Sequence, residues 1–315
     1  MTSVIDIFNS KIERPLALTI GFFDGVHLGH RYLVSELSEF AKKRNFASAV
    51  LTFRTHPRQV LHSDYIPSLL TTADEKIALL KETGVDYVVM TEFTREFSML
   101  TAQDFMRLLH DNLNVRCLMI GYDHRFGHNR SEKFEDYVRF GKEIGIEVVQ
   151  SSPLVIDGIN VSSSAVRKTI SEGDVAKAAK LLGREYSLAG QVVKGFQVGR
   201  TIGFPTANIS YDDSRILPKD GVYAARVTVE SHLYDAMLYI GSRPTVNTGK
   251  TSVEAYLFDF SDDIYGKNVN VRFVDRIRDS IKFDSIEELK KQLGKDEIKA
   301  KKQIANSKWQ IANDK

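Results

Sequence analysis

The stretch LALTIGFFDGVHLGH, residues 16–30, decides the architecture of the first half of the chain. It opens with an eight-residue apolar run, the length of a buried strand, and then makes an Asp-Gly turn. Residues 29–43 are predicted as a helix that ends in basic side chains. A buried strand that passes through a tight turn into a helix is the opening unit of an α/β sheet.

Two histidines lie at the start of this helix. His27 and His30 are three residues apart, so both can point from the first turn at one ligand. A helix N-terminus offers unpaired N–H groups and a positive potential, which suit a phosphate, and Gly29 lets the backbone approach it closely. Imidazole donors can also follow charge that moves from an α-phosphate to a departing pyrophosphate. The segment predicts a nucleotide site; the alternative is a pair of histidines that only cap the helix.

The rest of the first half alternates short apolar runs with amphipathic stretches. This alternation predicts a parallel sheet with helices on both faces, a Rossmann-like α/β fold, with ligands at the carboxyl ends of the strands. The further strands are expected at residues 47–53, 85–90, 115–120 and 146–150, and the helices at 73–83, 102–113, 134–142, 162–171 and 175–182.

Beyond residue 188 the segments become β-rich and are separated by turns, until a helical pattern over residues 285–302. Several short strands without crossover helices predict an antiparallel barrel or sandwich, here followed by a C-terminal helix. The total of 315 residues is enough for two domains. We expect these domains at residues 1–185 and 186–315.

A second candidate site is GFQVGRTIGFPTAN, residues 195–208. Gly195, Gly199 and Gly203 recur every four residues, which permits a flexible flap whose N–H groups meet phosphate oxygens. Thr206 and Asn208 then present oxygen atoms on one side of an extended chain. Oxygen ligands beside substrate phosphates are what Mg²⁺ prefers.

The composition limits the partners. The chain has 43 Lys and Arg against 41 Asp and Glu, a net charge of +2, and one cysteine, Cys117. This balance argues against a nucleic acid or an anionic membrane as partner. The chain shows neither a signal-peptide pattern nor an apolar run of bilayer length, so we expect a cytoplasmic protein without disulfides.

Residues 21–30 resemble the opening motif of the HxGH nucleotidyltransferases, and more narrowly that of the bacterial bifunctional riboflavin kinase/FMN adenylyltransferase family, or FAD synthetases. Further similar segments follow in order at residues 52–57, 121–127 and 162–167, and the second half resembles the riboflavin kinase module at residues 195–208, 217–223 and 253–260. The resemblance implies a nucleotidyltransferase domain followed by a riboflavin kinase-like barrel.

The same resemblance implies roles for individual residues. His27 and His30 would hold the ATP triphosphate in the first domain, while Thr206 and Asn208 would bind Mg²⁺ and ATP in the second. Glu254 would be the general base that accepts the proton of riboflavin's 5′-hydroxyl. The remaining ATP- or phosphate-binding candidates are Asp24, Gly25, Gly29, Asp123, Ser163, Ser164, Arg167, Gly195, Gly199 and Gly203.

The implied function is ATP-dependent phosphorylation of riboflavin to FMN in the second domain, then adenylylation of FMN to FAD in the first. Four residues depart from the family pattern: Phe22 stands where asparagine is frequent, Thr55 where proline is usual, His124 where an aromatic residue is usual, and Ser280 where glutamate is usual. They leave open an enzyme with one decayed module. A non-catalytic flavin or nucleotide sensor is the alternative from another class.

Overall fold

The computed structural model describes residues 2–62, 64–128, 130–195, 199, 202–242 and 251–307. The chain forms two compact units, Met1–Ser163 and Ser164–Lys315. The domain boundary expected between residues 185 and 186 stays a prediction. Part of the glycine-rich segment, residues 196–198 and 200–201, lies outside the described residues.

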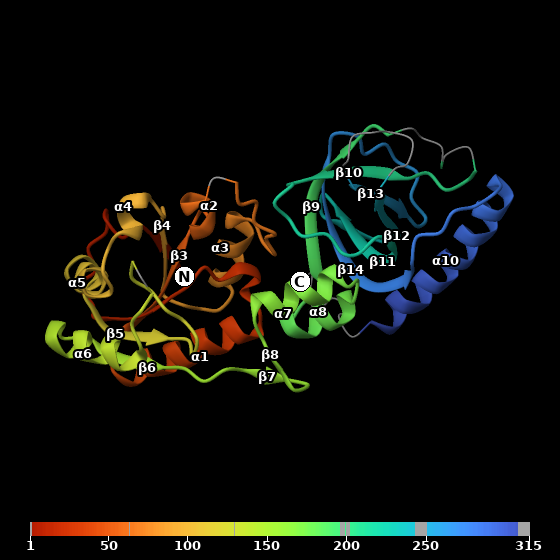
Figure 1. Ribbon diagram of the computed structural model, residues 1–315. Coiled ribbons are helices and arrows are strands. Elements are labelled where there is room, and N and C mark those ends of the chain that lie inside the picture. The colour runs from red at the N-terminus through yellow and green to blue at the C-terminus, as the bar shows by residue number, and fades with distance from the viewer. Residues whose placement is uncertain are drawn as a thin grey trace. The chain divides into compact units, whose positions relative to one another are not determined.

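The first unit is built on a six-stranded sheet in the order β1-β4-β3-β2-β5-β6, with every neighbouring pair parallel. From β2 onward, helices connect successive strands of this sheet (Figure 1). The strands are β1 (Ser3–Ile5), β2 (Leu16–Ile20), β3 (Ala47–Phe53), β4 (Tyr87–Thr91), β5 (Val115–Ile120) and β6 (Glu147–Gln150). The helices are α1 (Leu28–Lys43), α2 (Pro57–Leu61), α3 (Ala73–Lys81), α4 (Arg95–Ser98), α5 (Ala102–Leu113) and α6 (Phe134–Ile144).

Both faces of this sheet are covered, as its strand sequences require. All five residues of β2 are buried. Leu16 and Leu18 join the apolar cluster that includes α5 and α6, whereas Ala17 joins the cluster that includes α1 and α3. Successive side chains of a strand point to opposite faces, so a fully apolar strand needs a helical layer on each side. This confirms the predicted Rossmann-like α/β fold.

The strand order places the expected ligand edge. From β2 the chain moves to β3 and β4 on one side of the sheet, and later to β5 and β6 on the other. The carboxyl ends of β2 and β5 therefore flank the point at which the strand order reverses, where ligands of such sheets bind. The histidine motif follows β2, and Asp123 follows β5.

The second unit is a closed antiparallel barrel in the order β10-β13-β12-β11-β14-β9 (Figure 1), which confirms the predicted barrel. The short helices α7 (Ser163–Ser171) and α8 (Val175–Leu182) precede it in the chain. The strands are β9 (Tyr186–Val193), β10 (Ala207–Tyr211), β11 (Gly221–Val229), β12 (His232–Ser242), β13 (Thr251–Leu257) and β14 (Asn268–Arg278).

The predicted C-terminal helix is α10 (Ile286–Asn306), which packs on the outside of the barrel. Its buried residues Ala300 and Ile304 join an apolar cluster with residues of β11, β12 and β14. Arg278 at the end of β14 pairs with Asp296 of the helix at 2.7 Å, and this carboxylate is almost fully buried. These contacts fix the helix against one side of the barrel.

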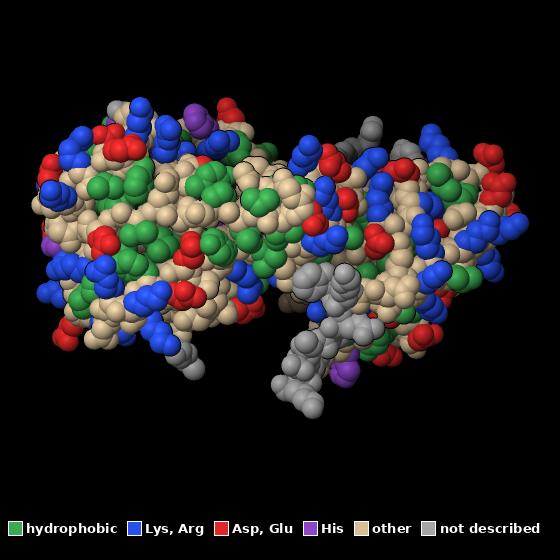
Figure 2. All heavy atoms as spheres, turned by 90° about the horizontal axis from the view of Figure 1, so that it is seen from below, with side chains coloured by type: hydrophobic (Ala, Val, Ile, Leu, Met, Phe, Trp, Pro, Cys, Tyr) green, Lys and Arg blue, Asp and Glu red, His purple; other side chains and the backbone are tan. Residues whose placement is uncertain are grey.

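Basic and acidic side chains are interspersed over the face of the molecule shown in Figure 2. No helix in the part of the chain that the structure describes has the length and apolar character needed to cross a membrane.

Candidate active sites

The turn that follows β2 has an unusual backbone. β2 ends at Ile20, earlier than the predicted strand, because Phe23 adopts a left-handed conformation with φ 54°. The next residues form the short 3₁₀ helix η1 (Asp24–Val26), in which Gly25 has φ 80° and Val26 has φ 37°. A β-branched residue with positive φ is strained, and such strain persists only where the surroundings hold it in place.

Asp24 is one of the residues that hold this turn. Its carboxylate is buried and accepts hydrogen bonds from the backbone N–H groups of Leu70 and Thr71, each at 3.0 Å. The Thr71 hydroxyl donates to the same carboxylate at 3.1 Å and accepts from the Gly25 N–H at 3.0 Å. The hydrogen bonds of Asp24 and Gly25 thus hold the turn in its conformation. Contact of these two residues with ATP stays a prediction.

The two histidines lie together at the start of α1, as the sequence predicts. His27 is the N-cap: its Nδ1 accepts a hydrogen bond from the His30 backbone N–H at 3.2 Å. The two rings stack with centroids 3.6 Å apart and planes 18° apart. Because Nδ1 accepts, the neutral His27 ring carries its proton on Nε2, which is then a donor. A stacked pair at a helix N-terminus is suited to an anion.

Gly29 is required by packing. A Cβ atom at this position would lie 2.7 Å from the Val161 carbonyl oxygen and 3.2 Å from the His27 ring. Any side chain would therefore displace the chain at Val161 or the catalytic candidate His27. Close approach of the Gly29 backbone to a bound phosphate stays a prediction.

The serine-rich segment begins α7. The Ser163 hydroxyl donates to the backbone carbonyl of Asp24 at 2.9 Å, so it adds a further support to the strained turn. Ser164 is exposed and Arg167 half-buried on the same helix. Both belong to the second compact unit, and their approach to the histidine pair stays a prediction.

An aromatic pocket opens at the carboxyl edge of the first unit's sheet. Its volume is about 90 Å³, and Asp123 lies nearby in sequence on an exposed turn directly after β5. Edge-to-face ring contacts build the wall, among them Phe53–Phe93 at 5.2 Å and Phe105–Phe126 at 5.5 Å. The lining residues are Ile20, Phe53, Pro57, Phe93, Phe97, Ser98, Leu100, Phe105, His124, Arg125, Phe126, Gly127 and Arg130.

His124 is one of the polar residues that line this aromatic pocket. Burial lowers the pKa of its imidazole to about 4, with a further contribution from the charge of Arg130, so the ring is neutral at physiological pH. Its Nε2 is buried and has no hydrogen-bond partner among the residues that the structure describes. A neutral imidazole can donate with one nitrogen and accept with the other, which a phenyl ring at this position could not do.

In the second unit the three residues expected to carry the kinase chemistry come together. Asn208 on β10 pairs directly with Glu254 on β13. The Thr206 hydroxyl donates to Glu254 Oε2 at 3.4 Å, and the Ser252 hydroxyl donates to Oε1 at 3.4 Å. Two hydroxyl groups thus orient one half-buried carboxylate beside an amide. This cluster offers hard oxygen ligands and a candidate base.

Among the described glycines of the flap segment, Gly195 lies directly against this cluster. A Cβ atom on Gly195 would come within 2.0 Å of Asn208 Nδ2, and one on Gly199 within 2.2 Å of the Phe204 carbonyl oxygen. Gly203 has φ 87°, a conformation that favours glycine. The backbone therefore passes closer to Asn208 than any side chain would allow. Phosphate contact by these glycines stays a prediction.

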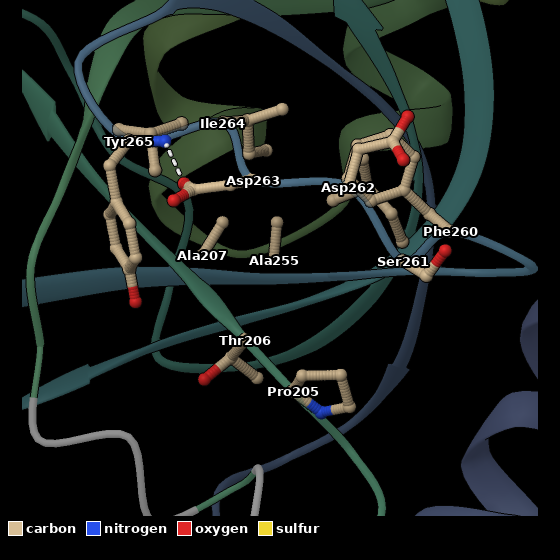
Figure 3. Close-up of a pocket in the computed structure, with 12 residues that line it drawn as sticks. Pro205, Thr206, Ala207, Ala255, Phe260, Ser261, Asp262, Asp263, Ile264 and Tyr265 are labelled. Atoms are coloured by element: carbon tan, nitrogen blue, oxygen red, sulfur yellow. Dashed lines mark hydrogen bonds between the residues drawn. The ribbon is translucent and has the colours of Figure 1, made fainter.

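A pocket of about 270 Å³ adjoins the cluster (Figure 3). The small side chains of Ala207 and Ala255 lie on neighbouring strands, and Tyr265 stands at one side of them. Asp263 accepts a hydrogen bond from the Tyr265 backbone N–H at 3.0 Å, which fixes the loop. Thr206 both lines the pocket and donates to Glu254, so it links the two.

Sequence reasoning missed several members of these sites. Ser252 lies two residues before Glu254 on the same face of β13, a position that strand alternation could have indicated. Tyr239 is the direct partner of Glu254 on β12, and its hydroxyl lies 3.1 Å from the Ser280 hydroxyl. No local signal reveals Tyr239, because strand pairing brings it there. The aromatic pocket and the buried Lys76 were also not anticipated.

Two family models match the chain. The FAD synthetase model matches residues 9–165, and the riboflavin kinase model matches residues 182–304. Curated relatives carry the name bifunctional riboflavin kinase/FMN adenylyltransferase. The relative from Escherichia coli (strain K12) is 39% identical over 291 residues, covering 92% of this chain and 93% of its own. The relative from Bacillus subtilis (strain 168) is 34% identical over 296 residues, covering 92% of each chain.

A crystal structure titled as a macrolide-efflux protein from Streptococcus pneumoniae is also similar. It is 33% identical, with a TM-score of 0.83, and the match covers 93% of this chain and 98% of that chain. The likeness supports the fold over nearly the whole length.

Proposed function

Since the chain belongs to the family of bifunctional riboflavin kinases/FMN adenylyltransferases, we propose that its two reactions run on the two residue clusters described above. The protein is an FAD synthetase: it phosphorylates riboflavin with ATP to give FMN, and it transfers an adenylyl group from ATP to FMN to give FAD and pyrophosphate. The family models place the adenylyl transfer in the first part of the chain and the phosphorylation in the second.

In the kinase cluster Glu254 is the general base. It accepts the proton of the ribityl 5′-hydroxyl while the new bond forms between that oxygen and the γ-phosphorus of ATP, and ADP leaves. The hydrogen bonds from Thr206 and Ser252 orient the carboxylate before the substrate arrives. The pairing of Asn208 with Glu254 is the observation that carries this assignment, because it puts base and phosphate ligands side by side.

Mg²⁺ fits the donors of this cluster, which are hydroxyl, amide and carboxylate oxygens. The described residues contain no group of three or more His, Cys, Asp or Glu side chains that could hold a metal alone. Thr206 and Asn208 would therefore hold the ion together with ATP, where it supplies charge neutralisation for the phosphates. The glycines 195, 199 and 203 would cover the phosphate chain with their backbone.

The pocket beside Thr206 suits the nucleoside of ATP in this reaction. Its floor is made of alanines and it is flanked by the ring of Tyr265, so a flat base can lie on an apolar surface. Thr206 lies at the border between pocket and cluster, which directs the phosphates toward Glu254.

In the adenylyl transfer the FMN phosphate is itself the nucleophile. It attacks the α-phosphorus of ATP, a P–O bond to pyrophosphate breaks, and no protein group needs to move a proton. His27 donates from Nε2, and with His30 it stabilises the charge that shifts toward pyrophosphate. Ser163, Ser164 and Arg167 would add donors, and Gly25 and Gly29 let the chain approach. Asp24 and Asp123 shape the site.

The aromatic pocket of the first unit suits the flavin. It lies at the carboxyl ends of β2 and β3, the strands that carry Ile20 and Phe53. About 90 Å³ accommodates one edge of the isoalloxazine ring system, which can stack on phenyl rings. His124 can then hydrogen-bond a polar atom of that edge, which turns a departure from the family pattern into a specificity contact.

Separate product analyses test the assignment. The full-length protein, His30→Ala and Glu254→Gln are each incubated with ATP and Mg²⁺, once with riboflavin and once with FMN, and the flavins are separated by chromatography. The wild type makes FAD from either substrate. His30→Ala accumulates FMN from riboflavin, because only the adenylyl transfer is lost. Glu254→Gln makes FAD when FMN is supplied but not when riboflavin is supplied, because only the phosphorylation is lost.

Glu230→Gln is the control, since Glu230 is exposed and pairs with Lys267 at the surface. It should behave as wild type. Loss of both activities in each site variant would contradict two separate sites. The alternatives of a decayed module or a non-catalytic sensor predict a missing product in the wild type itself.

For the partners we propose only the small-molecule substrates riboflavin, FMN and ATP, with neither a nucleic acid nor a membrane. A cytoplasmic location is part of the same proposal, because these substrates are metabolites of that compartment.

A further inference from the structure

Lys76 on α3 is a buried cation that neither reaction uses. Its side chain is only 2% exposed, and its Nζ donates to the carbonyl oxygens of Phe22 at 3.0 Å and Phe53 at 2.7 Å. The Nζ also lies 3.9 Å from the centre of the Phe22 ring. Lys76 forms no ion pair with any residue that the structure describes. A buried ammonium without a carboxylate partner is costly, so its presence calls for a purpose other than filling the core.

The carbonyl groups that Lys76 binds lie at the ligand edge of the sheet. Phe53 is the last residue of β3, and Phe22 follows the end of the adjacent β2. Strand ends leave carbonyl oxygens without a partner from the next strand, and buried ones need a donor. The Thr52 hydroxyl gives Phe22 O a second bond at 3.0 Å. Lys76 thus ties the ends of two central strands together.

The segment so held is the one that leads to His27. The next residue after Phe22 is Phe23, which has a left-handed backbone conformation, and the strained Val26 follows three residues later. The bonds that hold this turn come largely from residues 70–76: Leu70 and Thr71 bind Asp24, Thr71 binds Gly25, and Lys76 binds Phe22. Helix α3 and the residues before it therefore act as a brace under the turn.

We propose that Lys76 is a positioning residue for adenylyl transfer. By its hydrogen bonds to the ends of β2 and β3, it fixes the turn that presents His27 to the triphosphate. This inference rests on the proposed role of His27. Lys76 itself touches neither substrate. A displacement of His27 by a fraction of an ångström would then slow the reaction without removing any group that binds ATP.

Burial lowers the pKa of Lys76 to about 7; the carboxylate of Asp24 acts in the opposite direction, and the charge of Arg54 adds to the lowering. Either protonation state has the two N–H bonds needed for both carbonyl groups. The two hydrogen bonds of Lys76 can therefore form on both sides of neutral pH, and they act by fixing the geometry of the turn.

The test is a double-mutant cycle in the full-length protein with Lys76→Met, His27→Asn and the double variant. Lys81→Met is the matched control, because Lys81 lies on the same helix with an exposed side chain. Each variant is assayed for FMN to FAD and, as an internal measure of the amount of active enzyme, for riboflavin to FMN. Circular dichroism sets an assay temperature at which all variants are folded.

We expect Lys76→Met to lower kcat for FAD formation at least about tenfold and to change the KM for ATP by less than about threefold. Riboflavin phosphorylation and the Lys81→Met variant should stay within about twofold of wild type. In the His27→Asn background, Lys76→Met should cost less than about threefold more, because the residue it positions is gone.

Wild-type kcat in Lys76→Met, or effects that multiply in the double variant, would overturn the positioning role. An unchanged rate in His27→Asn would instead overturn the role of His27, so the two failures are distinct. Should Lys76→Met not fold, Lys76→Leu, which also lacks N–H donors, is measured in the same cycle and judged by the same outcomes.

Discussion

At the residue scale, Glu254 and His27 are both oriented by hydrogen bonds from neighbouring groups of the protein. Glu254 receives hydroxyl groups from Thr206 and Ser252, while His27 receives a backbone N–H at Nδ1. In each case the neighbour fixes the direction of a short side chain before the ligand binds. Such preorganisation lowers the cost of reaching the transition state.

Lys76 gives a stability prediction at this scale. Its folded pKa of about 7 lies below the ordinary 10.5, so between these values the unfolded chain binds more protons than the folded one. The free energy of unfolding of the first unit should then rise with pH from about 7 to about 10, by up to about 1.4 kcal/mol per pH unit.

The measurement is denaturant unfolding of wild type and Lys76→Met at several pH values in this window. The difference between the two curves isolates Lys76, since Asp24 and Arg54, the charged groups that act on it, are present in both. A difference that does not change with pH would show that Lys76 keeps an ordinary pKa.

At the element scale, connections between strands do most of the work of positioning. The turn after β2 places His27, and Gly195, which follows β9, lies against Asn208. In both places glycine is required by close approach of the backbone: Gly29 to the Val161 carbonyl, Gly195 to the Asn208 side chain. A glycine in a motif thus has a packing reason that is visible only once the neighbouring element is known.

Gly195→Ala tests this view. The added Cβ would overlap Asn208 Nδ2 at 2.0 Å and push the amide away from Glu254. Riboflavin phosphorylation should fall by about tenfold or more, while FAD formation from FMN is unchanged. The assay is initial-rate measurement of each reaction in the same preparation.

The control for this variant is Gly294→Ala on α10, where an added Cβ meets open space. It should keep both activities and stabilise the helix by about 0.5–1 kcal/mol. A wild-type kinase rate in Gly195→Ala would mean that the backbone at residue 195 moves away from Asn208 at little cost.

At the scale of the whole molecule, the two reactions belong to two units with their own cores. The first unit buries apolar residues on both faces of a parallel sheet, and the second packs α10 on a closed barrel. FMN is the product of one unit and the substrate of the other. The chain therefore joins two consecutive catalysts.

Mixing inactive chains tests how FMN travels. His30→Ala and Glu254→Gln proteins, each unable to make FAD from riboflavin, should together produce it after a lag, because FMN released by one chain binds the other. The lag should shorten as the Glu254→Gln concentration rises. A mixture that accumulates FMN without FAD would show that the product is not exchanged between chains.

The amino-acid sequence by itself determined the two fold classes and the main chemical groups. Fully apolar strands alternating with amphipathic helices specify a covered parallel sheet, and this information is local. The same holds for the histidine pair, whose spacing and position after a strand suffice. The amino-acid sequence did not reveal β1 or the short helices α2 and α4, because such short segments carry too little hydrophobic periodicity.

Only the tertiary structure decided which distant residues meet. Strand pairing brings Tyr239 beside Glu254, and helix packing places Lys76 under the ends of β2 and β3. These contacts depend on strand register and on the docking of elements far apart in the chain, which no local pattern encodes. The sequence names the groups that can react; the fold sets the neighbours that hold them in place.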